Sequence, residues 1–235
     1  MSLVINTNVA SLNAQRSLAK SGAELSTAME RLSSGKKINS AADDAAGFAI
    51  AERMTAQVRG LNMAAKNASD GLSMLATIEN ATNDVTDMLH RMRELAVQAA
   101  NDTNGATDRG YLQTEVTALI AEIDRVSSDT KYNGTAVLDG TFTTKKLQVG
   151  TEASQTITFS VDGVSASALS VDAVSVSSQA GATAALTAIS TAIEAVASDR
   201  ATYGALQNRL EYTVSNLMNV SEFTQAARSR IEDAD

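Results

Sequence analysis

Residues 40–100 read SAADDAAGFAI AERMTAQVRG LNMAAKNASD GLSMLATIEN ATNDVTDMLH RMRELAVQAA, and this stretch decides the fold. It contains no proline, and from Met54 onward its apolar residues recur at alternating steps of three and four. That period is typical of a long helix that packs along one seam against other helices. Two consecutive steps of three, from Leu72 to Ile78, resemble a coiled-coil stammer. The seam comprises Val58, Leu61, Ala65, Ala68, Leu72, Leu75, Ile78, Thr82, Val85, Leu89, Met92, Ala96 and Ala99.

Both ends of this stretch carry helix boundary signals. Ser40 and Asp43 have the spacing of a capping box, and Asp43 and Asp44 would lie at the positive end of the helix dipole. Asn104-Gly105 closes the helix at its other end. At 1.5 Å per residue, about sixty residues span roughly 90 Å, which predicts an elongated bundle rather than a compact domain.

The same helical rhythm continues on both sides of this stretch. Residues 1–34 predict a first helix that ends at Gly35. Thr107-Asp108 predicts the start of a third helix that runs to about Val126 and folds back antiparallel. Helix resumes at about Ala182. The apolar positions of the first helix are Ile5, Val9, Leu12, Leu18, Leu25, Met29 and Leu32.

A region of β-type sequence separates the third helix from the last. Turn dipeptides Asn133-Gly134 and Asp139-Gly140 precede two β-type runs, at 147–149 and 156–161. Residues 153–180 contain eight Ser and only two charged residues, so we interpret them as an exposed loop with short strands; Asp162-Gly163 is a candidate hairpin turn. The predicted fold class is mainly α: an elongated antiparallel bundle of long helices with a small β-hairpin region at one end.

The composition excludes several classes of function. The chain has no Cys, which excludes a disulfide framework and cysteine metal sites. Its net charge of -8 argues against nucleic acid as a partner. We find no apolar run that approaches the length of a membrane span. The N-terminus lacks the features of a Sec-type signal peptide, which taken alone indicates a cytoplasmic protein.

Sequence blocks near both ends of the chain resemble bacterial flagellin. They cover about residues 1–150 and 203–235, and their combination in this order is highly specific. The blocks are Ile5-Asn6-Thr7-Asn8, Leu12-Asn13-Ala14-Gln15, residues 32–47 (LSSGKKINSAADDAAG), residues 91–98 (RMRELAVQ), Glu122-Ile123-Asp124-Arg125-Val126, residues 204–210 (GALQNRL) and residues 227–235 (ARSRIEDAD).

The resemblance implies a division of the chain into three parts. Residues 1–39 would form an N-terminal inner-shell helix and linker. Residues 40–150 and 181–235 would form a core rod domain from both halves of the chain, and residues 151–180 a short variable insert. The chain departs from the family pattern in this short insert and in lacking the second terminal helix, so we expect it to be a soluble monomer that forms no stable filament by itself.

The sequence offers no catalytic or metal-binding motif. His90 is the only histidine, so an H-E-x-x-H motif is impossible, and no nucleophile motif surrounds any Ser. Helix capping explains the pair Asp43-Asp44, and a solvated face explains the acidic residues at 232–235. We therefore expect a protein that is not an enzyme and binds no cofactor or metal.

Three residues form the candidate contact site. Arg91 and Leu95 lie four residues apart on one helix, so they share a face, and Glu115 lies on the helix that should fold back beside them. Their positions match the family patch that contacts the flagellin-sensing Toll-like receptor of animals, and the resemblance implies that the patch is a subunit contact in the filament. Ordinary filament packing alone would also account for these residues.

The function that the resemblance implies is a structural subunit of the bacterial flagellar filament. Its implied partners are other flagellin subunits, the type III flagellar export apparatus, an export chaperone and the filament cap, and its implied location is outside the cell, on the flagellum. The alternative is a cell-surface flagellin-like protein that binds a polysaccharide, although four Tyr and four Phe offer few aromatic platforms. A hook–filament junction protein is a third, weaker alternative.

Overall fold

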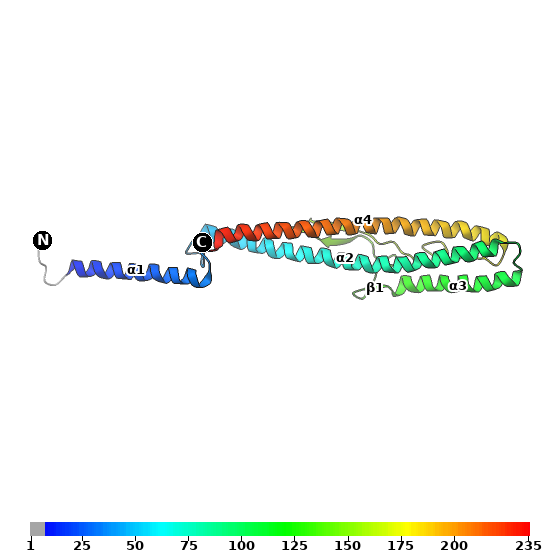
Figure 1. Ribbon diagram of the computed structural model, residues 1–235, viewed down its shortest axis with the longest axis horizontal. Helices are drawn as coiled ribbons and strands as arrows, with labels where there is room; N and C mark the ends of the chain where they lie inside the picture. The colour runs from blue at the N-terminus through cyan, green and yellow to red at the C-terminus, as the bar shows by residue number, and fades with distance from the viewer. Residues whose placement is uncertain (1–7) are drawn as a thin grey trace. The chain divides into compact units, whose positions relative to one another are not determined.

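The computed structural model describes residues 8–235, and in this part of the chain 70% of the residues are helical (Figure 1). The mainly helical class with small antiparallel strand pairs is confirmed. The chain divides into two compact units, one of residues 1–62 with 218–235 and one of residues 63–217, so each unit draws on both halves of the sequence. The elements are α1 (Val9–Ser34), α2 (Ala45–Ala100), α3 (Ala106–Asp129), β1 (Lys131–Tyr132), β2 (Thr135–Ala136), β3 (Lys145–Gln148), β4 (Thr156–Phe159) and α4 (Gln179–Glu232).

The predicted seam of α2 is the core-forming face of this helix. Leu75, Ile78, Val85, Leu89 and Met92 have no exposed surface at all. The remaining seam positions are buried as well, apart from Leu72, which is half-buried. Thr82 is a polar residue in the seam, and its Oγ1 donates to the Glu79 carbonyl at 2.9 Å, so its burial leaves no hydroxyl unpaired.

The start of α2 differs from the prediction. The helix begins at Ala45 instead of Ser40, because Asp44 Oδ1 accepts the backbone N–H groups of Ala46 and Gly47 at 3.1 and 3.0 Å. Asp43 belongs to the turn before the helix, where its Oδ2 accepts the N–H of Ser40 at 2.9 Å. The backbone N–H groups of Ser40 and then Asn39, by donating to this carboxylate, lower the pKa of Asp43. The predicted capping box is therefore wrong, and a single aspartate caps the helix.

Within the unit of residues 63–217, α3 returns antiparallel along α2, as the sequence predicted. Early in α3, Arg109 donates from Nε to the Ala99 carbonyl at 2.8 Å and so pairs with a free carbonyl at the end of α2. Later in α3, Glu115 contacts Arg91. Helix α4 packs on the same core through Ile189, Val196 and other buried residues.

The strands form two antiparallel pairs in this unit, which confirms the predicted hairpin region. Strands β1 and β2 are joined by Asn133-Gly134, where both residues have positive φ (48° and 80°), as a type I′ turn requires. Strands β3 and β4 pair from Lys145 opposite Phe159 to Gln148 opposite Thr156.

The segment after β4 is buried, which overturns the interpretation of residues 153–180 as an exposed loop. Its apolar residues alternate with exposed Ser, and the apolar ones join the core: Val161, Val164, Ala166, Leu169, Val171, Val174 and Val176. Side chains of α3 hold the segment in place, because Asp124 accepts the Ala166 N–H at 2.8 Å and Gln113 accepts the Val176 N–H at 2.6 Å. The structure has no hairpin turn at Asp162-Gly163.

Helix α4 is long and apolar enough, by length and composition, to cross a membrane; its most apolar window reaches a mean hydropathy of 1.4. The statement that no apolar run approaches a membrane span is therefore wrong for this helix. Only 28% of that window is buried. However, residues such as Ile189 and Val196 of this helix pack in the protein core.

In the unit of residues 1–62 and 218–235, α2 and α4 run antiparallel. Ser221 Oγ donates to Asn62 Oδ1 at 2.9 Å, and about two turns further along α4, Arg228 donates to Thr55 Oγ1 at 3.1 Å. Helix α1 begins after Asn8, whose Oδ1 accepts the Ser11 N–H, and ends at Gly35 with φ 70°. The first helix is thus confirmed from Val9; Ile5 lies outside the described residues.

Candidate functional site

Arg91 and Glu115 form an ion pair between α2 and α3. Arg91 Nε lies 2.8 Å from Glu115 Oε1, and Nη1 lies 2.9 Å from Glu94 Oε2, one helical turn along α2. The side chains of Arg91 and Glu115 are 50% and 44% exposed. The hydrogen bond to Glu115, followed by that to Glu94, raises the pKa of Arg91 above its usual value. The guanidinium is therefore held in one orientation on an accessible surface.

Leu95 does not share this surface, because it is only 1% exposed and belongs to the core. Positions four apart on a helix differ by about 40° in direction, enough to place Arg91 at the edge of the seam and Leu95 inside it. The structure thus brings Arg91 and Glu115 together and places Leu95 in the core of the same unit. Any part of Leu95 in a contact is indirect.

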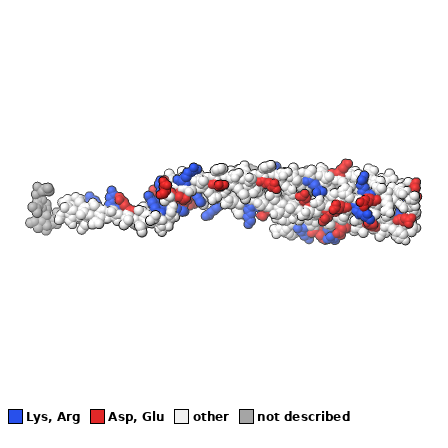
Figure 2. Space-filling model, viewed as in Figure 1, with Lys and Arg blue, Asp and Glu red and all other residues white. Residues whose placement is uncertain are grey.

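Sequence reasoning missed Glu94, the second carboxylate on Arg91. Its spacing of three from Arg91 is the signal that could have found it. Around this pair, His90, Arg93, Glu94 and Val97 line an open depression on α2. On the molecular face seen in Figure 2, Lys and Arg side chains are interspersed with Asp and Glu side chains among many uncharged residues.

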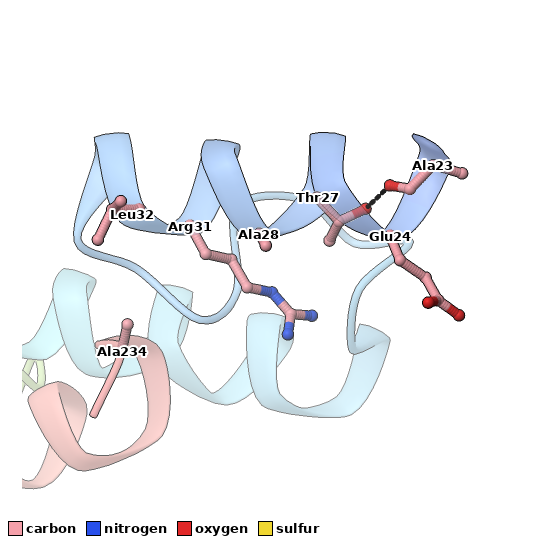
Figure 3. A pocket seen from close by; sticks show the side chains of 7 residues that line it. All are labelled: Ala23, Glu24, Thr27, Ala28, Arg31, Leu32 and Ala234. Carbon is pink, nitrogen blue, oxygen red and sulfur yellow. Dashed lines mark hydrogen bonds between the residues drawn. The ribbon is translucent and has the colours of Figure 1, made fainter. Parts of the chain in front are cut away.

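A second surface lies on α1. None of the residues in α1 is buried, and its apolar side chains are 54–81% exposed: Val9, Leu12, Leu18, Leu25, Met29 and Leu32. Figure 3 shows the Arg31 side chain extending from α1 into a pocket. Ala234, two residues after the end of α4, also lines this pocket. Residues Ala23, Glu24, Thr27, Ala28 and Leu32 complete the pocket.

The linker after α1 pairs with the end of α4. The Glu232 carbonyl accepts the N–H groups of Lys37 and Ile38 at 2.7 and 3.2 Å, and Ala234 donates to the Gly35 carbonyl at 3.0 Å. Lys36 Nζ lies 2.5 Å from Glu232 Oε1. The interpretation of residues 232–235 as a solvated acidic face is wrong for Glu232, whose side chain is 17% exposed and paired.

Over residues 8–235 the structure contains no cluster of three or more His, Cys, Asp or Glu side chains that could hold a metal ion. Asp43 and Asp44, the acidic pair singled out in the sequence, accept backbone N–H groups at the start of α2. These carboxylate oxygens therefore have a structural role as hydrogen-bond acceptors for the backbone.

Comparison with protein families gives two matches. The model of the bacterial flagellin N-terminal helical region matches residues 5–143, and that of the flagellin C-terminal helical region matches residues 186–235. The chain belongs to the bacterial flagellins. Residues 144–185, which include β3, β4 and the buried valines, lie between the two matches.

Individual flagellins are similar to the chain over nearly its whole length. The flagellin of Halalkalibacterium halodurans is 43% identical over 99% of this chain and 86% of its own length. The flagellin of Bacillus subtilis is 39% identical over 98% of this chain and 87% of its own. The crystal structure of Bacillus cereus flagellin has a TM-score of 0.58 and 34% identity, and it covers 65% of this chain and 88% of that one.

Family membership determines the main function. This flagellin is a structural subunit of the bacterial flagellar filament and polymerises with other flagellin subunits. The filament lies outside the cell surface. No finding favours the alternative of a polysaccharide-binding protein.

Proposed function

We propose that this flagellin joins the filament through the apolar stripe of α1 as an inner-shell helix, with residues 40–150 and 181–235 as the core rod domain and 151–180 as the insert. The observation that carries the proposal is the exposure of six large apolar side chains on one helix, from Leu12 at 54% to Leu32 at 81%. At 100° per residue, four of them fall within about 60° of one another around the helix: Leu18, Leu25, Met29 and Leu32. A soluble protein rarely leaves such an apolar stripe uncovered, so we expect it to be buried against neighbouring subunits.

The test is co-assembly: labelled chain is mixed with unlabelled flagellin from native filaments, and its incorporation into filaments grown from native seeds is measured. Leu25→Glu places a charge in the stripe and should abolish incorporation. Ser17→Glu adds the same charge at an exposed position of α1 that lies about 100° around the helix from Leu18 and about 80° from Leu25, and it should incorporate like the parent. Equal incorporation of both variants would mean that the stripe is not a subunit contact.

We also propose that Arg91 and Glu115 form a contact surface for neighbouring subunits and for the flagellin-sensing Toll-like receptor of a host, with Leu95 supporting that surface from the core. The support is the fixed guanidinium on an exposed surface, since an arginine whose geometry is already set loses little conformational entropy on binding. Arginine is also frequent among the residues that dominate interface energies.

Receptor-bearing reporter cells test this contact. Arg91→Ala should weaken activation by about tenfold or more. Arg59→Ala is the matched control, because it removes an exposed arginine of the same helix that lies outside the depression near Arg91 and for which the structure gives no ion pair among the described residues. Parent-like activation by Arg91→Ala would remove the residue from the contact.

The route out of the cell is a further part of the proposal. As a flagellin, the chain is expected to use the flagellar type III export apparatus, with an export chaperone inside the cell and the filament cap at the growing end. A strain lacking that apparatus should retain the protein; continued secretion would refute the route. We propose no catalytic activity, in line with the structural role of the family.

A further inference from the structure

We propose that Asn133 is a site of spontaneous chemical modification, at which its side-chain amide is lost through a succinimide. Asn133-Gly134 forms the two-residue turn between β1 and β2, and both residues are exposed. Over the described residues, no hydrogen bond engages the Asn133 amide or the Gly134 N–H. A glycine after asparagine offers the least hindered backbone nitrogen, because no side chain obstructs its approach to the amide carbon.

The reaction needs only water. The backbone nitrogen of Gly134, after losing its proton to solvent, attacks Cγ of Asn133. The new N–Cγ bond closes a five-membered ring, the Cγ–Nδ2 bond breaks, and the side-chain nitrogen leaves as ammonia with protons from water. One water molecule then opens the ring at either carbonyl, which gives an aspartyl or an isoaspartyl linkage at position 133.

A second asparagine–glycine pair in the chain is held in place. Gly105 donates its N–H to Asp108 Oδ2 at 3.0 Å, so the nitrogen that would attack is already engaged. Asn104 donates from Nδ2 to the Gln98 carbonyl at 2.6 Å, which fixes the amide that would be attacked. Both bonds must break before a ring can form at Asn104, whereas nothing comparable restrains Asn133.

The chain has three Asp-Gly pairs, which can form the same ring, and all three are restrained. Asp70-Gly71 lies inside α2, where the helix fixes the backbone. Asp139 Oδ1 accepts the N–H and the hydroxyl of Thr141 at 2.9 and 2.7 Å, and these bonds lower the pKa of Asp139. The carboxylate therefore stays ionised, and an ionised carboxylate is a poor electrophile. At Asp162-Gly163, a methyl group on Gly163 would lie 3.0 Å from the backbone of Gly140, so this pair is tightly packed.

The turn at Asn133 must open for the ring to close, and the strands around it allow this. Only two residue pairs join β1 to β2, and a hairpin that short opens readily at its exposed tip. The isoaspartyl product lengthens the main chain by one atom, so it should disrupt the pairing of Tyr132 with Thr135 and add a carboxylate near Lys131.

Hydroxylamine tests the proposal, because it traps a succinimide by cleaving the chain after the modified asparagine. The folded full chain, held at mildly alkaline pH with hydroxylamine, should yield fragments 1–133 and 134–235. Cleavage after Asn133 should exceed cleavage after Asn104 by about tenfold or more, the suppression expected from hydrogen bonds that include one to a charged group. Asn133→Gln should abolish the main cleavage, since glutamine forms the larger ring slowly.

Two comparisons attribute the preference to the fold. In denaturant, the cleavage rates at the two sites should approach one another. Asp108→Ala, with its folding verified by circular dichroism, should raise cleavage after Asn104. Equal cleavage at both sites in the folded parent, or a preference that survives in denaturant, would overturn the proposal.

Discussion

Leu95→Ala should destabilise the unit of residues 63–217 strongly, although Leu95 belongs to the candidate contact site. Leu95 is 1% exposed in the core, and truncation of a buried leucine removes its transfer free energy and leaves a cavity. Such truncations cost about 2–5 kcal/mol, and a fully buried site in a long, packed helix belongs near the middle of that range, at ~3 kcal/mol. For a unit of this size, ~3 kcal/mol corresponds to a fall in Tm of roughly 6–12 °C.

Circular dichroism during heating measures the change. Leu95→Met is the matched control, because it nearly conserves volume and should cost less than ~1.5 kcal/mol. Arg91→Ala should leave Tm close to that of the parent, since exposed ion pairs contribute little to stability. A Tm for Leu95→Ala within about 2 °C of the parent would refute the assignment of Leu95 to the core, as the scaling above then leaves less than ~1 kcal/mol. It would reopen a direct contact role.

Two further substitutions test the packing of α4. Chemical denaturation measures both effects. Gly181→Ala should destabilise the protein by about 1–3 kcal/mol, because the new methyl group would lie 2.7 Å from the Ser175 carbonyl oxygen. Gly204→Ala has open space around the new methyl group and should stabilise the protein by about 0.5–1 kcal/mol. If Gly181→Ala is neutral, the buried segment is not held against α4. Asp199→Asn should stabilise the protein at neutral pH, because burial and then the nearby charge of Asp162 raise the pKa of Asp199 in the folded state. Above its folded-state pKa, ionised Asp199 opposes folding. The gain in stability from Asp199→Asn should therefore shrink as pH falls through the folded-state pKa and disappear below the unfolded-state pKa. The same gain in stability at all pH values would contradict this.

The sequence predicted the helices well because their signal is repeated many times. The seam of α2 alternates steps of three and four over some forty residues, so one ambiguous position such as Leu72 changes nothing. The start of α2 depends on only two or three residues. Ser40 and Asp44 are both good caps, and the choice between them rests on backbone geometry that the pattern does not contain.

The sequence predicted an exposed loop after β4, whereas the segment is buried, and the difference has a physical reason. Its Ser content and lack of charge resemble an exposed loop, yet its valines recur mostly at steps of two and three, so that Ser faces solvent and Val faces the core. What decides burial is a surface contributed from elsewhere. Gln113 and Asp124 of α3 supply hydrogen-bond acceptors for this segment from more than forty residues away in sequence. Local composition cannot show such a partner.

In the candidate contact site, too, the sequence predicted one part correctly and another part wrongly. The spacing of four predicted that Arg91 and Leu95 share one face of the helix, but the edge of the buried face lies between the two positions. On one side of this edge the arginine reaches α3 and pairs with Glu115 at 2.8 Å; on the other the leucine fills the core. A substitution at either position can weaken the same contact, one by removing the guanidinium and the other by loosening the helices that present it. Only a joint measurement of Tm and binding distinguishes the two causes, because Arg91→Ala should lower binding alone, whereas Leu95→Ala should lower both.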